Sequence, residues 1–270
     1  MDNLNKIGRV LFGIPFVGFG VQYFIYGRFA GGLPPAPPWT PGAPATAYVL
    51  GALLIAAGAT IAASATIAAD TKARLLATVL GILVFICVLA MFISTPSVVL
   101  HDGTARTRAL EPLALAGAAW VLAGSPQNQT PNVQSWFATE KLATIGRFIF
   151  GASMVVFGFQ HFMYGQFVAM LVPSWLPWHI FWTYFFGVAL IAAGISIITG
   201  IQARLAALLL GLMFLLWVVV LHAPRVAASP HNGDEWSSLF VAIAMCGSCF
   251  IIAAAAASRA RPNDLSNSDT

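Results

Sequence analysis

Long apolar runs separated by short polar segments dominate the chain. Eight of these runs approach the roughly 20 apolar residues that a helix needs to cross a bilayer. They lie at 7–27, 46–68, 74–93, 108–124, 145–165, 180–199, 203–222 and 236–257. This pattern predicts an all-α membrane protein with about eight transmembrane helices, in which the run at 108–124 is the weakest.

The two halves of the chain resemble each other. Residues 7–29 align without gaps on 145–167, and 13 of these 23 positions are identical. Residues 48–58 likewise match 184–194 at seven of eleven positions. Apolar composition alone does not place the same Arg, Gln, Tyr and Gly in register, so the pattern indicates an internal duplication.

Each half contains four of the predicted spans, and an even number of spans returns the chain to the side on which it started. The halves therefore share one orientation, which predicts two tandem four-helix bundles in a parallel repeat. The expected organisation is a first repeat at 1–124, a cytoplasmic linker at 125–144, a second repeat at 145–258 and a polar C-terminal tail at 259–270.

Composition and charge support this interpretation. Hydrophobic residues make up 59% of the chain and charged residues 8%, with a mean hydropathy of +0.83, whereas soluble domains carry roughly 25% charged residues. The basic residues stand singly among apolar runs, which argues against a nucleic-acid partner. Nine of the 13 Lys and Arg residues fall on the predicted inner side, so the positive-inside rule predicts an inner (plasma) membrane protein with both termini cytoplasmic.

The first helix of the second half ends in Gln160, His161 and Tyr164. Gln160 and Tyr164 are four residues apart and share a helix face, and the unperturbed pKa of a histidine lies near neutrality. Together with Trp178, from a Pro- and Trp-rich segment at 172–179, they predict an outer-leaflet pocket for a quinone-like headgroup, with that segment as its lid. The alternative is that these side chains anchor helix ends at the membrane interface.

Two other groups of residues carry side chains that could do redox or metal chemistry. Cys246 and Cys249 form a C-x-x-C pair, but their position in mid-membrane opposes thiolate chemistry, so packing is favoured over redox work. Further histidines and acids fall near the outer side, namely His101, His179, His222, His231, Glu111, Asp234 and Glu235. No pair among them has tight ligand spacing, so no metal site is predicted.

Several segments resemble the DoxX/DoxD-like family of four-helix membrane proteins. The resemblance rests on Gly146-Arg147, on Phe157 to His161 and on Gly187 to Gly194, and it extends over 145–222 and, less closely, over 7–93. DoxD-type members are membrane subunits of a thiosulfate:quinone oxidoreductase, so the resemblance implies a four-helix bundle per half and a link to respiratory redox chemistry. No residue pattern here marks a thiosulfate site, and this chain is doubled, so that activity is not carried over.

Three functions fit these features. The favoured one is a redox-linked, quinone-associated membrane subunit that meets a membrane or peripheral oxidoreductase. The second is a non-enzymatic membrane scaffold or assembly factor. The third is a small-solute transporter, which ranks last because the spans hold almost no polar or charged groups at mid-membrane. The sequence leaves open whether the protein is an enzyme and which oligomer it forms.

Overall fold

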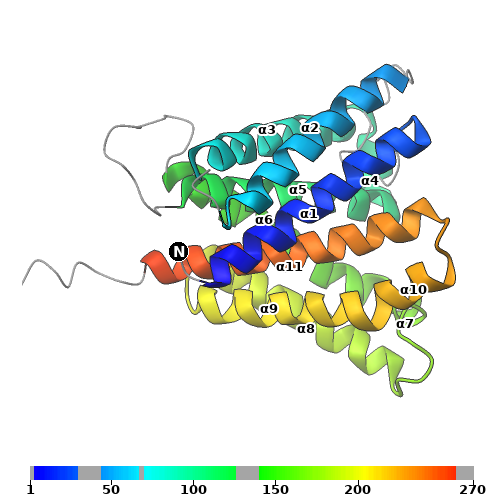
Figure 1. The fold of residues 1–270 in the computed structure, drawn as a ribbon. Helices are drawn as coiled ribbons and strands as arrows, with labels where there is room; N and C mark the ends of the chain where they lie inside the picture. Colours follow the sequence, from blue (N-terminus) through cyan, green and yellow to red (C-terminus); the bar gives the residue numbers. More distant parts are fainter. Residues whose placement is uncertain (1–2, 30–43, 67–69, 126–139, 260–270) are drawn as a thin grey trace, which may run out of the picture.

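The protein is described here by a computed structural model, which defines residues 3–29, 44–66, 70–125 and 140–259. Within these ranges the secondary structure is helical, and the long helices run side by side as one elongated bundle (Figure 1). The elements are α1 (Asn3–Tyr26), α2 (Pro44–Ala63), α3 (Asp70–Ser94), α4 (Pro96–His101), α5 (Gly103–Gly124), α6 (Glu140–Met163), α7 (Gly165–Ala169), α8 (His179–Thr199), α9 (Ala203–Trp217), the π-helical segment η1 (Val218–His222), α10 (Ala223–Ala228) and α11 (Gly233–Arg259). Most of the predicted linker (126–139) and of the predicted tail (260–270) lies outside the described residues.

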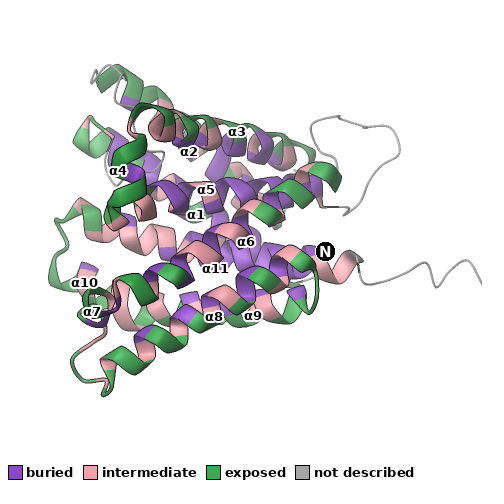
Figure 2. Ribbon diagram, turned by 180° about the vertical axis from the view of Figure 1, so that it is seen from behind, coloured by how far each residue is buried: buried purple, intermediate pink, exposed green. Residues whose placement is uncertain are grey.

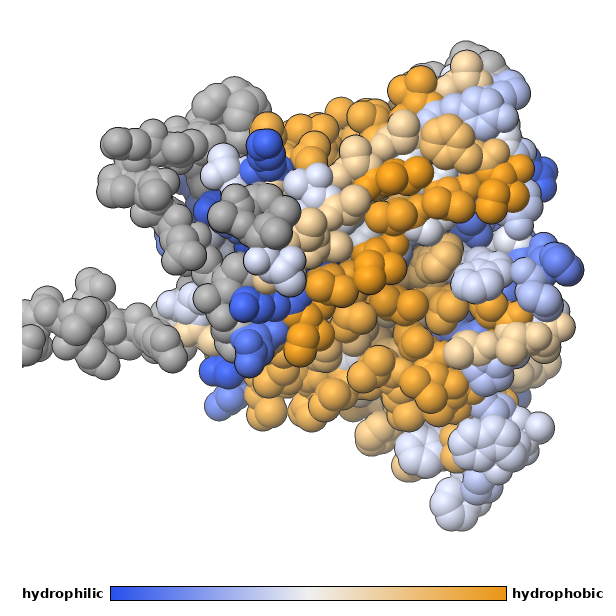
Figure 3. All heavy atoms as spheres, in the orientation of Figure 1, coloured by the Kyte–Doolittle hydropathy of each residue, from blue (hydrophilic) through white to orange (hydrophobic). Residues whose placement is uncertain are grey.

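Seven helical stretches in the described part of the chain are long and apolar enough to cross a membrane. They are α1, α2, α3, α6, α8, the continuous run Ala203–Ala228 that joins α9, η1 and α10, and α11. Large apolar side chains such as Val79, Ile86 and Leu209 are exposed along them. Figure 3 shows the result as an apolar band between two more polar ends. The prediction of an all-α, multi-pass membrane protein is therefore confirmed.

The predicted fourth span, 108–124, is the exception and requires a correction. The corresponding helix α5 starts earlier, at Gly103, and is not among the helices apolar enough to qualify as a span. Arg108 and Glu111 in its first half lower its hydropathy, while every residue from Ala114 to Gly124 is buried. Helices α3, α6 and α11 pack around it (Figure 2). Because protein rather than lipid covers α5, it does not need the composition of a lipid-facing helix.

The packing of the helices differs from two separate four-helix bundles. Within the predicted halves, α1 packs on α2 and α6 packs on α8, as expected. The last helix of each half, however, packs extensively against the first helix of the other half: α11 lies on α1, and α5 lies on α6. Since α5 and α11 also touch each other, the described helices form one continuous bundle. The parallel relation between the halves stays a prediction.

Glycines allow the first two helices of each half to approach backbone to backbone. A Cβ atom added at Gly13 would lie 2.4 Å from the carbonyl oxygen of Gly58, and one added at Gly151 would lie 2.8 Å from that of Gly194. Small residues permit such close crossings in membrane bundles, where van der Waals packing replaces the hydrophobic effect. The same glycine contact therefore joins α1 to α2 and α6 to α8.

A buried ion pair joins the helices at the end of the bundle where α1 begins and α5 ends. Arg9 is only 2% exposed, and its Nη2 lies 2.6 Å from Oδ1 of Asp70. Its Nη1 donates a hydrogen bond of 2.9 Å to Oγ of Ser64. Arg74 on the same side donates from Nε to the carbonyl oxygen of Ala123, at 2.8 Å. The two arginines thus bind helix ends to one another inside the protein.

Candidate ligand-binding cavity

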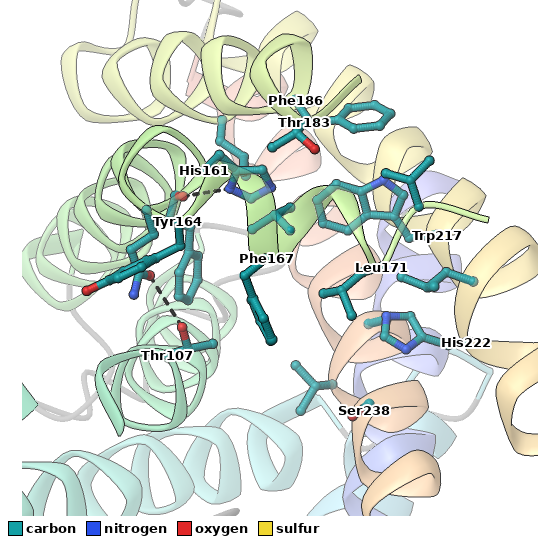
Figure 4. Close-up of a pocket in the computed structure, with 18 of the residues that line it drawn as sticks. Thr107, His161, Tyr164, Phe167, Leu171, Thr183, Phe186, Trp217, His222 and Ser238 are labelled. Carbon is teal, nitrogen blue, oxygen red and sulfur yellow. Dashed lines mark hydrogen bonds between the residues drawn. The ribbon is translucent and has the colours of Figure 1, made fainter. Parts of the chain in front are cut away.

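A cavity of about 670 Å³ lies at the opposite end of the bundle, where α5 begins and α6 ends. Its walls come from α5, α6, α7, the segment 171–176, α8, α9, η1 and α11, and Figure 4 shows the side chains that converge on it. Phe167 and Leu216, which line it, are 57% and 51% exposed, so the cavity reaches the surface of the protein. Ligand pockets typically measure roughly 300–1,000 Å³. The cavity is therefore large enough for a small organic ligand.

The walls are mainly apolar and aromatic. Six of the residues that form them are Phe157, Phe186, Leu190, Phe214, Trp217 and Met245. The ring of Trp217 meets those of Phe186 and Phe214 edge to face, with centroids 5.4 and 5.3 Å apart. Such edge-to-face contacts stabilise aromatic clusters beyond the area they bury. The result is a flat-sided apolar space with a few polar groups on its surface.

Gln160 holds the start of α5 against the end of α6. Its Nε2 donates to the carbonyl oxygen of Gly103 at 3.1 Å. Its Oε1 lies 3.4 Å from Oγ1 of Thr107, whose single hydrogen is shared between this oxygen and the nearer carbonyl oxygen of Gly103, at 3.0 Å. The ring of Tyr164 covers the same glycine, because a Cβ at Gly103 would lie 2.6 Å from a ring carbon of Tyr164. Both ends of the Gln160 side-chain amide therefore contact α5, and this residue links the end of α6 to the start of α5 beside the cavity.

His161 has one ring nitrogen fixed and the other available. Its Nδ1 is 2.8 Å from the carbonyl oxygen of Phe157, and its ring stacks on Trp217 with centroids 6.3 Å apart (Figure 4). A carbonyl oxygen only accepts hydrogen bonds, so Nδ1 carries the proton and Nε2 of the neutral ring is an acceptor. Among the described residues no side chain or backbone group bonds to Nε2.

Three of the four predicted site residues line the cavity, and Trp178 does not. Trp178 is 74% exposed at the start of α8, where its φ of 59° turns the chain into the helix. The neighbouring segment still contributes Val172, Pro173 and Leu176 to the wall, so part of the predicted lid does border the cavity. Exposed indoles such as Trp178 and Trp175 suit a membrane interface instead. Ligand binding by Gln160, His161 and Tyr164 stays a prediction.

The π-helical segment contributes a second histidine to the cavity. Val220, Leu221 and His222 of η1 line it, and Nδ1 of His222 is buried without a hydrogen-bond partner in the described part of the chain. Single π-helical turns within longer helices occur frequently at functional sites. Sequence reasoning grouped His222 only with the scattered outer histidines, because a π turn leaves no periodic signal that would have marked it.

Charged groups lie where α5 enters the cavity. Arg108 and Glu111, three residues apart on α5, both line it. The start of α5 is fixed by Asp102, whose carboxylate accepts hydrogen bonds from the backbone N–H groups of Thr104 and Ala105, at 2.7 and 3.2 Å. An Asp cap of this kind satisfies amide groups that a helix start leaves free. The capped start therefore holds Arg108 and Glu111 at a defined place in the wall.

The cysteine pair lies away from this site. Cys246 and Cys249 are buried in α11 and are not bonded to each other. Their neighbour Met245 lines the cavity, but neither cysteine does. Both belong to the packed core around α5, which agrees with a packing role. The packing role of the pair stays a prediction.

The first half repeats the hydrogen bonds of Gln160 at its own end. Gln22 on α1 donates from Nε2 to the carbonyl oxygen of Gly233 at 2.9 Å. Its Oε1 lies 3.1 Å from Oγ of Ser237, whose single hydrogen is shared with the carbonyl oxygen of Gly233, at 2.8 Å. Gly233 starts α11 as Gly103 starts α5. At the position that aligns with His161, the first half carries Tyr23, which is completely buried. The ends of α1 and α6 therefore share a glutamine that bonds to the first residue of another helix, but the residue after this glutamine is a tyrosine in α1 and a histidine in α6.

Within the described residues, no group of three or more His, Cys, Asp or Glu side chains is arranged to hold a metal ion. Comparison of the chain with protein-family models, with curated proteins and with solved structures finds no match.

Proposed function

We propose that the protein binds a quinone-like, amphipathic ligand in this cavity and acts as a redox-linked membrane subunit. The observation that carries the proposal is an apolar cavity of about 670 Å³ into which two imidazoles face, each with a nitrogen that no described residue binds. Aromatic walls suit a flat ring, and a few polar groups suit the oxygens at its edge. The exposed rim formed by Phe167 and Leu216 leaves room for an apolar tail to extend toward lipid.

The cavity favours this function over a scaffold. Wall atoms around an empty cavity lose dispersion contacts, which destabilises a protein. A scaffold gains nothing from such a space, whereas a ligand that fills it restores those contacts. The centre of the bundle does not support a transporter. There α5 is buried from Ala114 to Gly124 among apolar neighbours, which offer a polar solute no binding groups.

The proposal includes an origin by duplication of a DoxX/DoxD-like four-helix unit. Support comes from the aligned sequences, from the glycine contacts that join α1 to α2 and α6 to α8, and from the matching hydrogen bonds of Gln22 and Gln160. A subunit of this kind would sit in the inner membrane with both termini cytoplasmic and would meet a membrane or peripheral oxidoreductase there.

Binding can be measured on the full chain in nanodiscs. Because Trp217 lines the cavity, a decyl-substituted benzoquinone that binds there is expected to quench tryptophan fluorescence with a saturable dissociation constant. Tyr164→Phe is expected to weaken binding by about tenfold, because it removes an O–H that can donate one hydrogen bond to a quinone carbonyl. Tyr26→Phe is the matched control, because Tyr26 holds the aligned position in the first half, is exposed and does not line the cavity. Absence of saturable quenching in the parent protein, or equal binding by the two variants, would favour the scaffold.

A further inference from the structure

Three polar side chains in the wall of the cavity, those of His161, Thr183 and Ser238, have used a hydrogen within the protein. His161 uses its Nδ1 proton on Phe157, as described above. Thr183 Oγ1 donates to the carbonyl oxygen of His179 and Ser238 Oγ to that of Asp234, each at 3.0 Å. A hydroxyl that has donated its only hydrogen can still accept. What these groups offer to a ligand is therefore acceptor atoms.

Among these acceptors, His161 places the strictest requirement on a ligand, because its Nε2 needs a hydrogen-bond donor. Its Nδ1 proton is engaged by the backbone of its own helix and its ring lies against Trp217, so in this conformation Nε2 offers the cavity an acceptor and no donor. An oxidised quinone carries only carbonyl oxygens, which would face Nε2 acceptor to acceptor. A hydroquinone carries O–H groups, and one of them can donate to Nε2. A buried acceptor left without a donor costs free energy that a hydrogen-bonded one does not.

His222 can donate to either redox form or accept from the reduced one, because its Nδ1 has no described partner and its neutral ring can carry the N–H on either nitrogen. Further donors border the cavity beside the start of α5. Tyr164 and Arg108 line it beside the start of α5, and both carry N–H or O–H groups for which no protein acceptor is found in the described residues. They can serve an oxygen of either redox form, because a hydroquinone hydroxyl also accepts. The contact that distinguishes the two forms is therefore the one at His161.

We propose that the cavity selects the reduced, hydroxyl-bearing form of its ligand, a hydroquinone, over the oxidised quinone, through the acceptor Nε2 of His161. This inference rests on the proposed function and adds the redox form that the site prefers. It assigns to His161 a role in ligand specificity, while Gln160 links α6 to α5 and does not select the ligand.

The test compares three ligands on the full chain in nanodiscs under anaerobic conditions at pH 8, where a histidine side chain with the reference pKa of about 6.5 is neutral. They are a decyl-substituted hydroquinone, the corresponding benzoquinone, and the dimethyl ether of the hydroquinone, which keeps the ring and the tail but carries a methyl group in place of each hydroxyl hydrogen. The quinone is followed by quenching of tryptophan fluorescence, and the other two by its displacement. The parent protein is expected to bind the hydroquinone about tenfold more tightly than either of the others, as one net hydrogen bond provides.

Two variants of His161 distinguish the role of the acceptor Nε2 from that of Nδ1, which bonds to the carbonyl oxygen of Phe157. His161→Asn keeps an N–H near the position of Nδ1 for the carbonyl of Phe157 but has nothing at Nε2, so the preference for the hydroquinone is expected to disappear. His161→Gln places an amide oxygen near the position of Nε2, so part of the preference is expected to remain. Equal affinity of the parent for hydroquinone and benzoquinone, or an unchanged preference in His161→Asn, would overturn the inference while leaving the proposed function in place. Failure of the parent to bind any of the three would overturn both.

Discussion

The ion pair between Arg9 and Asp70 gives the sharpest prediction about stability. Asp70→Asn removes the negative charge and keeps the size of the side chain. Arg9 is 2% exposed and would retain only its hydrogen bond to Ser64 among the contacts described for its guanidinium. The variant therefore leaves a positive charge inside the bundle without its counter-charge.

Removal of one partner from a buried pair typically costs about 3–5 kcal/mol, because the other charge stays buried and uncompensated. Asp70 is 32% exposed, so part of this cost is screened, and a loss of about 2–3 kcal/mol is expected. In a protein of this size each kcal/mol lowers the melting temperature by about 2–4 °C. The expected decrease is on the order of 5–10 °C.

The measurement is thermal unfolding of the purified full chain in one detergent at one heating rate. Glu235→Gln is the matched control: it breaks the pair between Glu235, which is 17% exposed, and Arg225, which is 41% exposed. The cation left without its partner is then the exposed member, so water screens its charge and a smaller loss is expected. The double variant Arg9→Met with Asp70→Asn removes the closest charge pair and is expected to recover most of the loss. Arg74 lies farther from Asp70, at 4.0 Å, and keeps its hydrogen bond to the carbonyl oxygen of Ala123. The reasoning is refuted if Asp70→Asn lowers the melting temperature no more than Glu235→Gln does, or if the double variant is less stable than Asp70→Asn.

Two further predictions concern the cysteines and the orientation of the chain. Cys246→Ala and Cys249→Ala are expected to cost about 1 kcal/mol each, because each removes one heavy atom from a packed site, and ligand binding should be unchanged. A maleimide is expected to label both cysteines only after unfolding; a disulfide between them in the purified protein would contradict this. Reporter fusions at Thr270 and within 30–44 are expected to report the cytoplasm and the outer side, from the nine-to-four split of basic residues; the same compartment for both fusions would refute the orientation.

The sequence was sufficient wherever a property depends on neighbours along one helix. Apolar length predicted the membrane-spanning helices, because lipid imposes the same requirement on every such segment. The 3.6-residue period predicted that Gln160, His161 and Tyr164 lie together at one helix end, and they line one cavity. Burial of the cysteine pair followed in the same way from its place in the middle of an apolar run.

Tertiary structure decided whatever depends on which helices meet. The sequence counted α5 as a weak span, but its composition reflects burial among α3, α6 and α11 rather than contact with lipid. Trp178 stands five residues from Thr183, yet the turn into α8 leaves the indole outside the cavity and Thr183 in its wall. His222 reaches the cavity through a π-helical turn that no hydrophobic period encodes. Hydrophobic periodicity specifies which face of a helix is covered, but the partner that covers it is chosen by shape, as where glycines let α1 meet α2 and where α11, rather than α5, lies on α1.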